Sequence, residues 1–230
     1  MKLSDDTVQV LKNLSTINQN IVFKSGNSVS TISEARNILT TASISESIPQ
    51  DFGVYDLNQF LGVLGLVDEP EVKFEEKFAT VGDATGRSRV KYFFTDIEML
   101  TAPGEQMLDK AKSMDNFEVK FVLDQGTFNG LKKAAGALGH SSVSITPNNG
   151  SISLTVFEPE DSTSNSYTID VPGTYDEDST FKFVISINNL KILPGDYNVS
   201  LSSKLMSKFS HKEKDIQYWI ALEKTSTYGE

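Results

Sequence analysis

The sequence contains no cysteine, one tryptophan and two histidines in 230 residues. Disulfide bonds and thiolate chemistry are therefore excluded, and the composition is consistent with a reducing cytosol. No apolar run follows the N-terminal segment MKLSD, so we expect no signal peptide. No apolar stretch approaches the roughly 18 to 20 residues that a membrane helix needs, and we expect no membrane span.

Basic residues are also scarce, with 21 lysines and arginines against 31 acidic residues and a net charge of -10. A protein of this charge is a poor loose binder of nucleic acids or anionic membranes, although a local basic surface is not excluded. Hydrophobic residues make up 38% and aromatic residues 10% of the chain, which is enough to form a core. The length suits one large domain or two of about 115 residues.

No catalytic or metal-binding motif stands out. The stretch GDATGRS, residues 82–88, resembles a phosphate-binding loop but is one residue short of GxxxxGK[ST] and carries Arg87 in place of the lysine. We interpret it as a hairpin loop. Neither His140 nor His211 lies near a plausible nucleophile in the sequence, so a small hydrolase is retained only as a third hypothesis. We predict no catalytic residue, no metal and no cofactor.

One segment of the sequence recurs in similar form later in the chain. DDTVQVLKNL, residues 5–14, aligns with residues 125–134 when the chain is shifted by 120 positions. Both segments fit amphipathic helices, predicted over 4–17 and 127–138, with Ser4 or Asp5 capping the first. The matched pairs are Thr7 with Thr127, Val8 with Phe128, Leu11 with Leu131 and Lys12 with Lys132. In the first helix we expect Val8, Leu11, Leu14 and Ile17 to face the core.

A second pair of segments, LNQF at 57–60 and INNL at 187–190, matches at an offset of 130 in the same order along the chain. The ordered pair of matches predicts two related α+β domains, at 1–100 and 116–230, joined by a linker at 101–115. Short helices are predicted at 55–67 and 186–193. Alternating apolar residues predict strands at 21–23, 29–32, 38–48, 72–78, 90–94, 117–123, 143–145, 152–156, 167–171, 181–185, 197–201, 205–209 and 216–222. The stretch between Asp96 and Asn116 loses this pattern.

Long stretches of the chain resemble the DNA polymerase sliding clamps of T-even-type bacteriophages. They are MKLSDDTVQVLKNLSTIN, IVFKSGN, VYDLNQFLGVLGLV, TAPGEQM, STFKFVISINNLKILPGDYNVSL and YWIALEKTST. The resemblance implies a DNA clamp fold of two similar domains, with antiparallel sheets outside and helices on the inner face. It further implies a homotrimeric ring around duplex DNA, without catalytic activity, in the host cell cytoplasm. The implied partners are the DNA polymerase, an ATP-driven clamp loader and late transcription factors, and no membrane.

A helix that lines such a ring needs an apolar face on the sheet and a basic or polar face toward the DNA. The predicted DNA-facing residues are Lys2, Lys12, Lys132, Lys133 and Lys191. Lysine suits a sliding protein because it neutralises phosphate without the bidentate geometry of arginine, and phosphate contacts carry no sequence information. The alternative is that these lysines are ordinary solvated residues.

Partner peptides are expected under the loop that joins the domains, with the last long strand as the far wall. The predicted pocket residues are Met99, Leu100, Pro103, Met107, Tyr218, Trp219 and Ile220. Because neighbouring strand residues point to opposite faces, only one of Tyr218 and Trp219 can line a given pocket, and both are alternatively core residues. Subunits are expected to pair through open strand edges, sought at 110–112 and 199–209.

A β-rich phage structural or assembly protein that does not encircle DNA is the second hypothesis. The acidic charge, the many strands and the lack of catalytic residues fit this hypothesis as well as they fit a clamp. The repeated lysine-bearing helix separates the two hypotheses, because a structural protein has no reason to repeat it.

Overall fold

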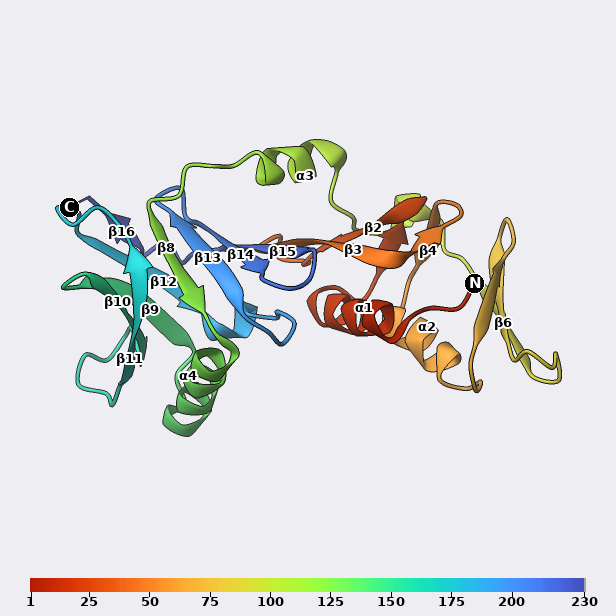
Figure 1. Ribbon diagram of the computed structural model, residues 1–230, viewed down its shortest axis with the longest axis horizontal. Coiled ribbons are helices and arrows are strands. Elements are labelled where there is room, and N and C mark those ends of the chain that lie inside the picture. Colours follow the sequence, from red (N-terminus) through yellow and green to blue (C-terminus); the bar gives the residue numbers. More distant parts are fainter. Residues whose placement is uncertain (230) are drawn as a thin grey trace. The chain divides into compact units, whose positions relative to one another are not determined.

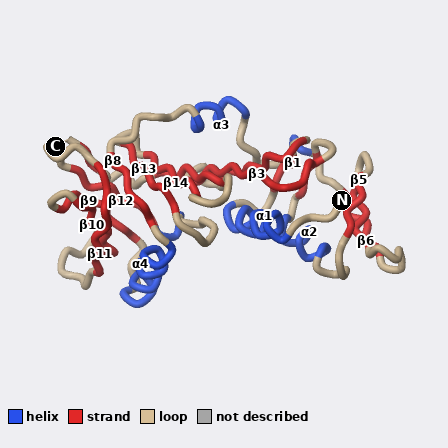
Figure 2. The backbone as a smooth tube through the Cα atoms, in the orientation of Figure 1, coloured by secondary structure: helices blue, strands red, loops and turns tan. Residues whose placement is uncertain are grey.

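The computed structural model describes residues 1–229 of the chain (Figure 1). The chain divides into two compact units, Met1–Leu108 and Asp109–Glu230. Strands make up most of the regular structure in each unit, with few helices (Figure 2). None of the helices within residues 1–229 is both long and apolar enough to cross a membrane.

In unit 1, a first helix is followed by four strands and a second helix by three more. These elements are α1 (Asp5–Ile17), β1 (Ile21–Phe23), β2 (Gly26–Ile32), β3 (Ile38–Ile48), β4 (Phe52–Val54), α2 (Leu57–Leu64), β5 (Glu71–Phe74), β6 (Phe78–Gly82), β7 (Arg89–Phe93) and the 3-10 helix η1 (Ile97–Met99). A further helix, α3 (Glu105–Lys112), runs across the division between the units.

Helix α1 forms where the sequence predicts it. Ser4 is the N-cap residue, and its hydroxyl accepts a hydrogen bond from the Thr7 amide at 3.2 Å. Val10, Leu11, Leu14 and Ile17 are buried where the helix lies against β3 and α2 (Figure 1). The prediction that Val8 belongs to this stripe was wrong. Val10 is buried instead. Thr7 and Leu14 lie near the middle of the buried face, and Val8 lies more than a quarter turn away from them around the helix.

The strands of unit 1 are antiparallel and form three groups. β2 pairs with β3, β1 pairs with β4, and β5, β6 and β7 form a three-stranded sheet in that order. The single strand predicted at 72–78 is wrong, because the chain turns at residues 75–77 and separates β5 from β6. The exposed polar turn residues Glu75, Glu76 and Lys77 carried the signal for this break.

Unit 2 contains one long helix and a continuous antiparallel sheet. Its elements are β8 (Val119–Leu123), α4 (Gln125–Leu138), β9 (Ser142–Asn148), β10 (Ser151–Phe157), β11 (Tyr167–Thr174), β12 (Phe181–Ser186), the 3-10 helix η2 (Ile187–Asn189), β13 (Tyr197–Ser202), β14 (Met206–His211), β15 (Ile216–Ala221) and β16 (Thr227–Tyr228). The strand order in this unit is β16-β12-β9-β10-β11-β8-β13-β14-β15. Helix α4 lies against β10 and β11. The α+β class predicted from the sequence is confirmed.

The N-terminus of α1 is held by an acidic residue of β3. The Glu46 carboxylate accepts hydrogen bonds from the Ser4 amide at 2.6 Å and from the Thr7 hydroxyl. Partial burial acts to raise the pKa of Glu46, but the hydrogen bonds from Thr7 and Ser4 outweigh it and leave the pKa below its ordinary value of 4.5. The ionised carboxylate therefore stabilises the start of α1, where the helix dipole also favours negative charge.

We expect Glu46→Gln to weaken hydrogen-exchange protection of the α1 amides by about 1 kcal/mol at pH 7. A lowered pKa means that the ionised state stabilises the fold above the unfolded pKa, and that this contribution is lost as the pH falls through the folded pKa. The difference from the wild type should therefore shrink below pH 4.5. Exchange of the α4 amides in the same molecule is the internal control, and an equal loss there would contradict a local effect.

Candidate nucleic-acid interface

The two repeated helices share their N-terminal chemistry. In α4 the Asp124 carboxylate takes the place of the Ser4 hydroxyl and accepts hydrogen bonds from the Thr127 amide at 2.8 Å and the Thr127 hydroxyl at 2.7 Å. Thr7 and Thr127, matched in the sequence, are both buried at the third helical position. Hydrogen bonds from Thr127 lower the pKa of Asp124, so this cap stays ionised at neutral pH.

The matched lysines also occupy the same position on their helices. Leu11 and Leu131 are buried, whereas Lys12 and Lys132, one residue later, are exposed. Lys133 is exposed beside Lys132. The Lys132 ammonium lies 5.4 Å from the centre of the Phe128 ring, which keeps its stem along the helix.

The two helices differ in surface charge. α4 carries two lysines and no acidic residue, whereas α1 carries Asp5 and Asp6 with Lys12. Helix α2 has no charged residue. The basic helical surface is therefore concentrated on α4. The pairing of Lys12 with Lys132 in the sequence did not indicate this difference between the two helices.

The remaining predicted DNA-facing lysines are Lys2, just before α1, and Lys191, just after η2, and their surroundings differ. The Lys2 ammonium lies 3.3 Å from a carboxylate oxygen of Glu69, an exposed ion pair. Lys191 is exposed and follows η2. A cavity of about 430 Å³ brings Lys132 of α4 together with Asn188 of η2.

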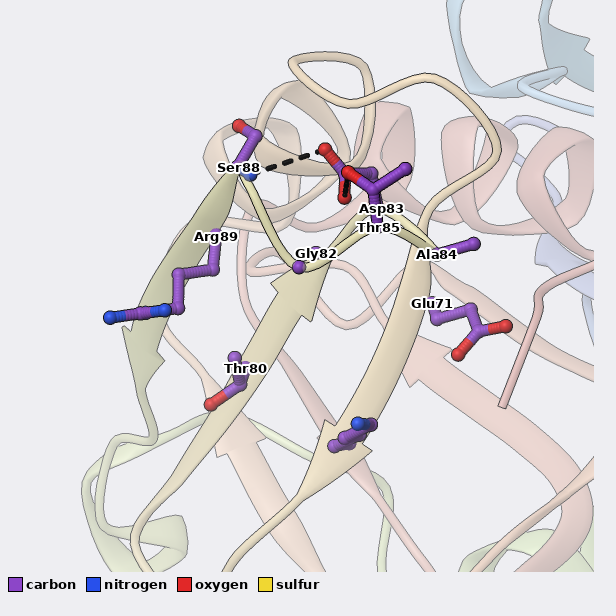
Figure 3. A pocket seen from close by; sticks show the side chains of 10 residues that line it. Glu71, Thr80, Gly82, Asp83, Ala84, Thr85, Ser88 and Arg89 are labelled. Carbon is purple, nitrogen blue, oxygen red and sulfur yellow. Dashed lines mark hydrogen bonds between the residues drawn. The ribbon is translucent and has the colours of Figure 1, made fainter.

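The stretch 82–88 forms the loop of the β6–β7 hairpin, as predicted. The Asp83 carboxylate accepts hydrogen bonds from the Thr85 hydroxyl at 2.7 Å and the Ser88 amide at 3.1 Å (Figure 3). It also accepts one from the Arg87 amide at 3.2 Å. A phosphate-binding loop needs such amides free to hold the anion, and here an internal carboxylate already occupies them.

The predicted partner-pocket residues fall into two groups. In the loop at 97–114, which contains most of the linker, Met99 is 80% exposed and Met107 is 40% exposed, while Leu100 and Pro103 are half-buried. The Thr101 amide donates a hydrogen bond to the Asn20 side chain, which ties this end of the linker to unit 1. The linker therefore presents apolar side chains to solvent, which is typical of a binding surface.

The β15 residues of that prediction lie in the core. Tyr218 and Ile220 are fully buried, and Trp219 is 2% exposed. The Tyr218 hydroxyl accepts a hydrogen bond from the Leu193 amide, and the Lys208 ammonium lies 5.5 Å from the Trp219 ring. These side chains are therefore core residues in this structure, the alternative that strand alternation had left open, and are not an exposed pocket wall.

The strand edges open for pairing differ from the segments predicted. Residues 110–112 lie on the helix α3, and 199–209 lies in β13 and β14, each paired on both sides. Within residues 1–229, β7 pairs only with β6, and β11 pairs with β8 only through Gly173 and Thr174. The prediction was wrong for both segments. Residues 110–112 are helical, and the hairpin strands β13 and β14 are paired on both sides within the sheet.

Among the described residues, β2 and β5 also pair with a neighbour on one side only. Two further open edges, β7 and residues 167–171 of β11, are each five residues long. Each carries an exposed aromatic residue, Phe93 at 64% and Tyr167 at 37%. Two hydrogen bonds show which backbone groups of this segment point toward β6. The Phe94 amide donates to the Lys77 carbonyl, and the Ser88 carbonyl accepts from the Asp83 amide. By alternation, the backbone groups of Arg89, Lys91 and Phe93 point to the open side.

The fold matches solved DNA clamps. The PCNA2–PCNA3 complex from Sulfolobus tokodaii aligns with a TM-score of 0.68 at 14% identity, over 97% of this chain and 99% of that chain. Proliferating cellular nuclear antigen from Entamoeba histolytica aligns with a TM-score of 0.66 at 14% identity, over 94% of both chains. At this identity the likeness establishes the fold alone, which is the fold of PCNA-type clamps.

Sequence comparison identifies the family. Residues 4–94 match the family described as DNA polymerase processivity factor, and residues 120–224 match gp45 sliding clamp, C terminal. The sliding clamp of Vibrio phage KVP40 is 32% identical over 97% of this chain and 99% of its own length. Those of Enterobacteria phage T4 and Escherichia phage RB69 are each 31% identical over 99% of both chains.

This chain therefore belongs to the phage sliding clamps, the processivity factors of DNA polymerase. The resemblance to the T-even-type clamps is confirmed. Members of this family are scaffolds without catalytic activity, so the chain is not an enzyme. The hypotheses of a structural phage protein and of a hydrolase are not supported by these relatives.

Proposed function

We propose that three copies of this chain join head to tail in a ring around duplex DNA and tether the replicative polymerase to it. The observation that carries this proposal is the repeated lysine-bearing helix, one in each unit of a clamp fold, with matched caps, matched buried leucines and matched exposed lysines.

In this ring the DNA-facing surface is made by Lys12, Lys132 and Lys133, with Lys2 and Lys191 beside them. Lysines on a helical surface attract phosphates of any sequence, and the attraction costs little to break and reform as the ring slides. The acidic remainder of the chain, with a net charge of -10, discourages DNA from binding outside the ring. Because α4 is the more basic helix, unit 2 makes the stronger contact.

The open edges of β7 and β11 join neighbouring copies. Pairing these two five-residue edges satisfies the backbone groups that each leaves open, and it covers Phe93 and Tyr167. A contact between two different surfaces is heterologous, and it closes into a ring when the rotation between copies allows.

The polymerase binds at the linker through a short peptide that covers Met99, Leu100, Pro103 and Met107. Exposed apolar side chains of this kind serve as anchors in partner interfaces. A clamp loader driven by ATP opens and closes the ring, and late transcription factors use the same surface. The protein acts in the cytoplasm of the host cell.

We expect Met99→Ser with Met107→Ser to shorten polymerase products on a primed circular template in the presence of the clamp loader. Loss of two apolar anchors should weaken polymerase binding roughly tenfold or more. Leu66→Ser is the matched control, since Leu66 is also exposed, at 71%, but follows α2 and lies far from the linker in the sequence. If the control shortens the products as much as the linker variant does, the peptide does not bind at the linker.

A further inference from the structure

We propose that opposite charge on the two open edges fixes the direction in which copies join. A basic edge formed by Arg87, Arg89 and Lys91 on one copy meets an acidic edge, centred on Asp170, on the next. This inference rests on the ring proposed above, and it adds which residues choose the partner edge.

The basic edge carries no acidic residue of its own. From Arg87 to Phe93 the sequence is RSRVKYF, with three basic side chains, all exposed. Among the residues that the structure describes, none of the three forms an ion pair within 4.0 Å. The Lys91 ammonium lies 3.8 Å from the centre of the Phe78 ring and 4.8 Å from that of Phe93, so it is held at the edge.

The acidic residues nearest to this edge do not neutralise it. Glu71 lies across two strands from Arg89 in the pairing register, roughly 10 Å away at the usual strand spacing. The Asp83 carboxylate accepts hydrogen bonds from its own loop. The positive charge of β7 is therefore available to a partner.

The second edge has the opposite character. From residue 158 to residue 178 the chain has seven acidic side chains and no lysine or arginine. They are Glu158, Glu160, Asp161, Asp170, Asp176, Glu177 and Asp178. Asp170 lies within the open stretch of β11 and is exposed, with its carboxylate accepting a hydrogen bond from the Ser153 hydroxyl of β10. The others lie in the loops that flank β11 at both ends.

These charges leave one favourable combination. Two β7 edges would place three positive charges against three, and two β11 edges would place acidic loops against each other. A β7 edge against a β11 edge brings opposite charges together, so identical copies are directed to head-to-tail contacts and away from isologous dimers. Exposed charges are screened by salt, so the joint should loosen as ionic strength rises.

Sedimentation equilibrium on the whole chain tests this inference. We expect the wild type to form a species of three times 25.3 kDa. The protein concentration at which half of this species is dissociated should rise as the salt concentration is raised. Lys91→Glu and Asp170→Lys should each raise the concentration of half-dissociation roughly tenfold, because each places like charges at every joint. The two changes combined in one chain should restore assembly to within about threefold of the wild type.

The matched control is Lys112→Glu, which reverses an exposed lysine on α3 and should leave the mass unchanged. Circular dichroism establishes that each variant is folded, and recovery in the combined variant excludes misfolding as the cause. A trimeric wild type whose assembly is insensitive to salt and to both single changes overturns the charge-directed joint and leaves the ring in place. A wild type that is monomeric at every concentration and salt level overturns the ring itself.

Discussion

Reversing Lys12, Lys132 and Lys133 to glutamate should shorten the residence of the loaded clamp on circular DNA by roughly 10- to 100-fold, with folding and assembly intact. The three side chains are exposed on helices whose opposite faces form the core, so the change alters surface charge without disturbing packing. In a ring of three copies each lysine acts three times. Because each phosphate contact contributes about 0.9 to the slope of log affinity against log salt, the salt dependence should also become shallower.

Retention after loading onto nicked circular DNA, measured at several salt concentrations, provides the readout. A control with Lys120, Lys182 and Lys224 reversed carries the same change of net charge on exposed positions outside the helices. Its retention should stay close to that of the wild type. Equal loss in both triple variants would assign the effect to total charge, and unchanged retention in the first would remove these lysines from DNA binding.

Within the first triple, the surface charges of the helices predict an unequal division. Lys132→Glu with Lys133→Glu should account for most of the loss, since α4 has no acidic residue to offset them. Lys12→Glu should contribute less, because Asp5 and Asp6 already lower the potential around α1.

The helices were predictable because several signals coincide in each. Ser4 supplies a cap for the first helix, Leu11 and Leu131 mark the buried face, and the repeat supports the pattern. The Asp124 cap was not predicted, and α4 begins at Gln125, two residues before the predicted start at 127. Helix α3 was missed for the opposite reason. None of its residues is buried, and its eight residues place only Met107, Leu108 and Ala111 on an apolar face, which is too short a pattern to stand out; Glu105 at its start and Lys110 and Lys112 in its last turn also fit a helix.

The candidate site was harder to predict than the fold because exposure depends on the tertiary structure. Alternation on β15 placed Tyr218 and Trp219 on opposite faces but could not show that both faces are covered. The open edges depend on strand order, which the sequence of β7 and β11 does not contain. Their exposed aromatic residues, Phe93 and Tyr167, were indistinguishable in the sequence from core aromatics.

Gly195→Ala should destabilise unit 2 by about 3 to 5 kcal/mol. Gly195 has φ of +141°, which side chains rarely adopt, and a Cβ placed there would lie 2.1 Å from Nε2 of His211. The His211 ring cannot move aside easily. Its Nδ1 accepts hydrogen bonds from the Glu213 and Lys214 amides, and its Nε2 therefore carries the proton and donates to the Pro194 carbonyl at 3.1 Å.

Urea unfolding followed by the fluorescence of Trp219 measures this effect, because this sole tryptophan is buried in unit 2. Gly139→Ala is the matched control. Gly139 also has a positive φ, of +73°, but a Cβ at this position would have no neighbouring atom within 4 Å, so only backbone strain of about 1 kcal/mol applies. Equal midpoints for the two variants would show that the contact with His211 contributes nothing.

In a His211→Ser background, Gly195→Ala should cost less than in the wild-type background, because the ring contact is gone and only backbone strain at Gly195 remains. The His211→Ser single variant is the reference for this comparison, since it also loses the hydrogen bonds of the ring. The loop that contains Gly195 and Asp196 also contacts the start of α4, the helix that carries Lys132 and Lys133. The Gly195 amide donates a hydrogen bond to the Gln125 side chain, and the Asp196 carboxylate accepts one from the Gln125 amide at 2.9 Å. A displaced loop would therefore loosen the first turn of α4, so Gly195→Ala should weaken DNA retention even where unit 2 remains folded. In the His211→Ser background, the effects of Gly195→Ala on stability and on retention should both be smaller.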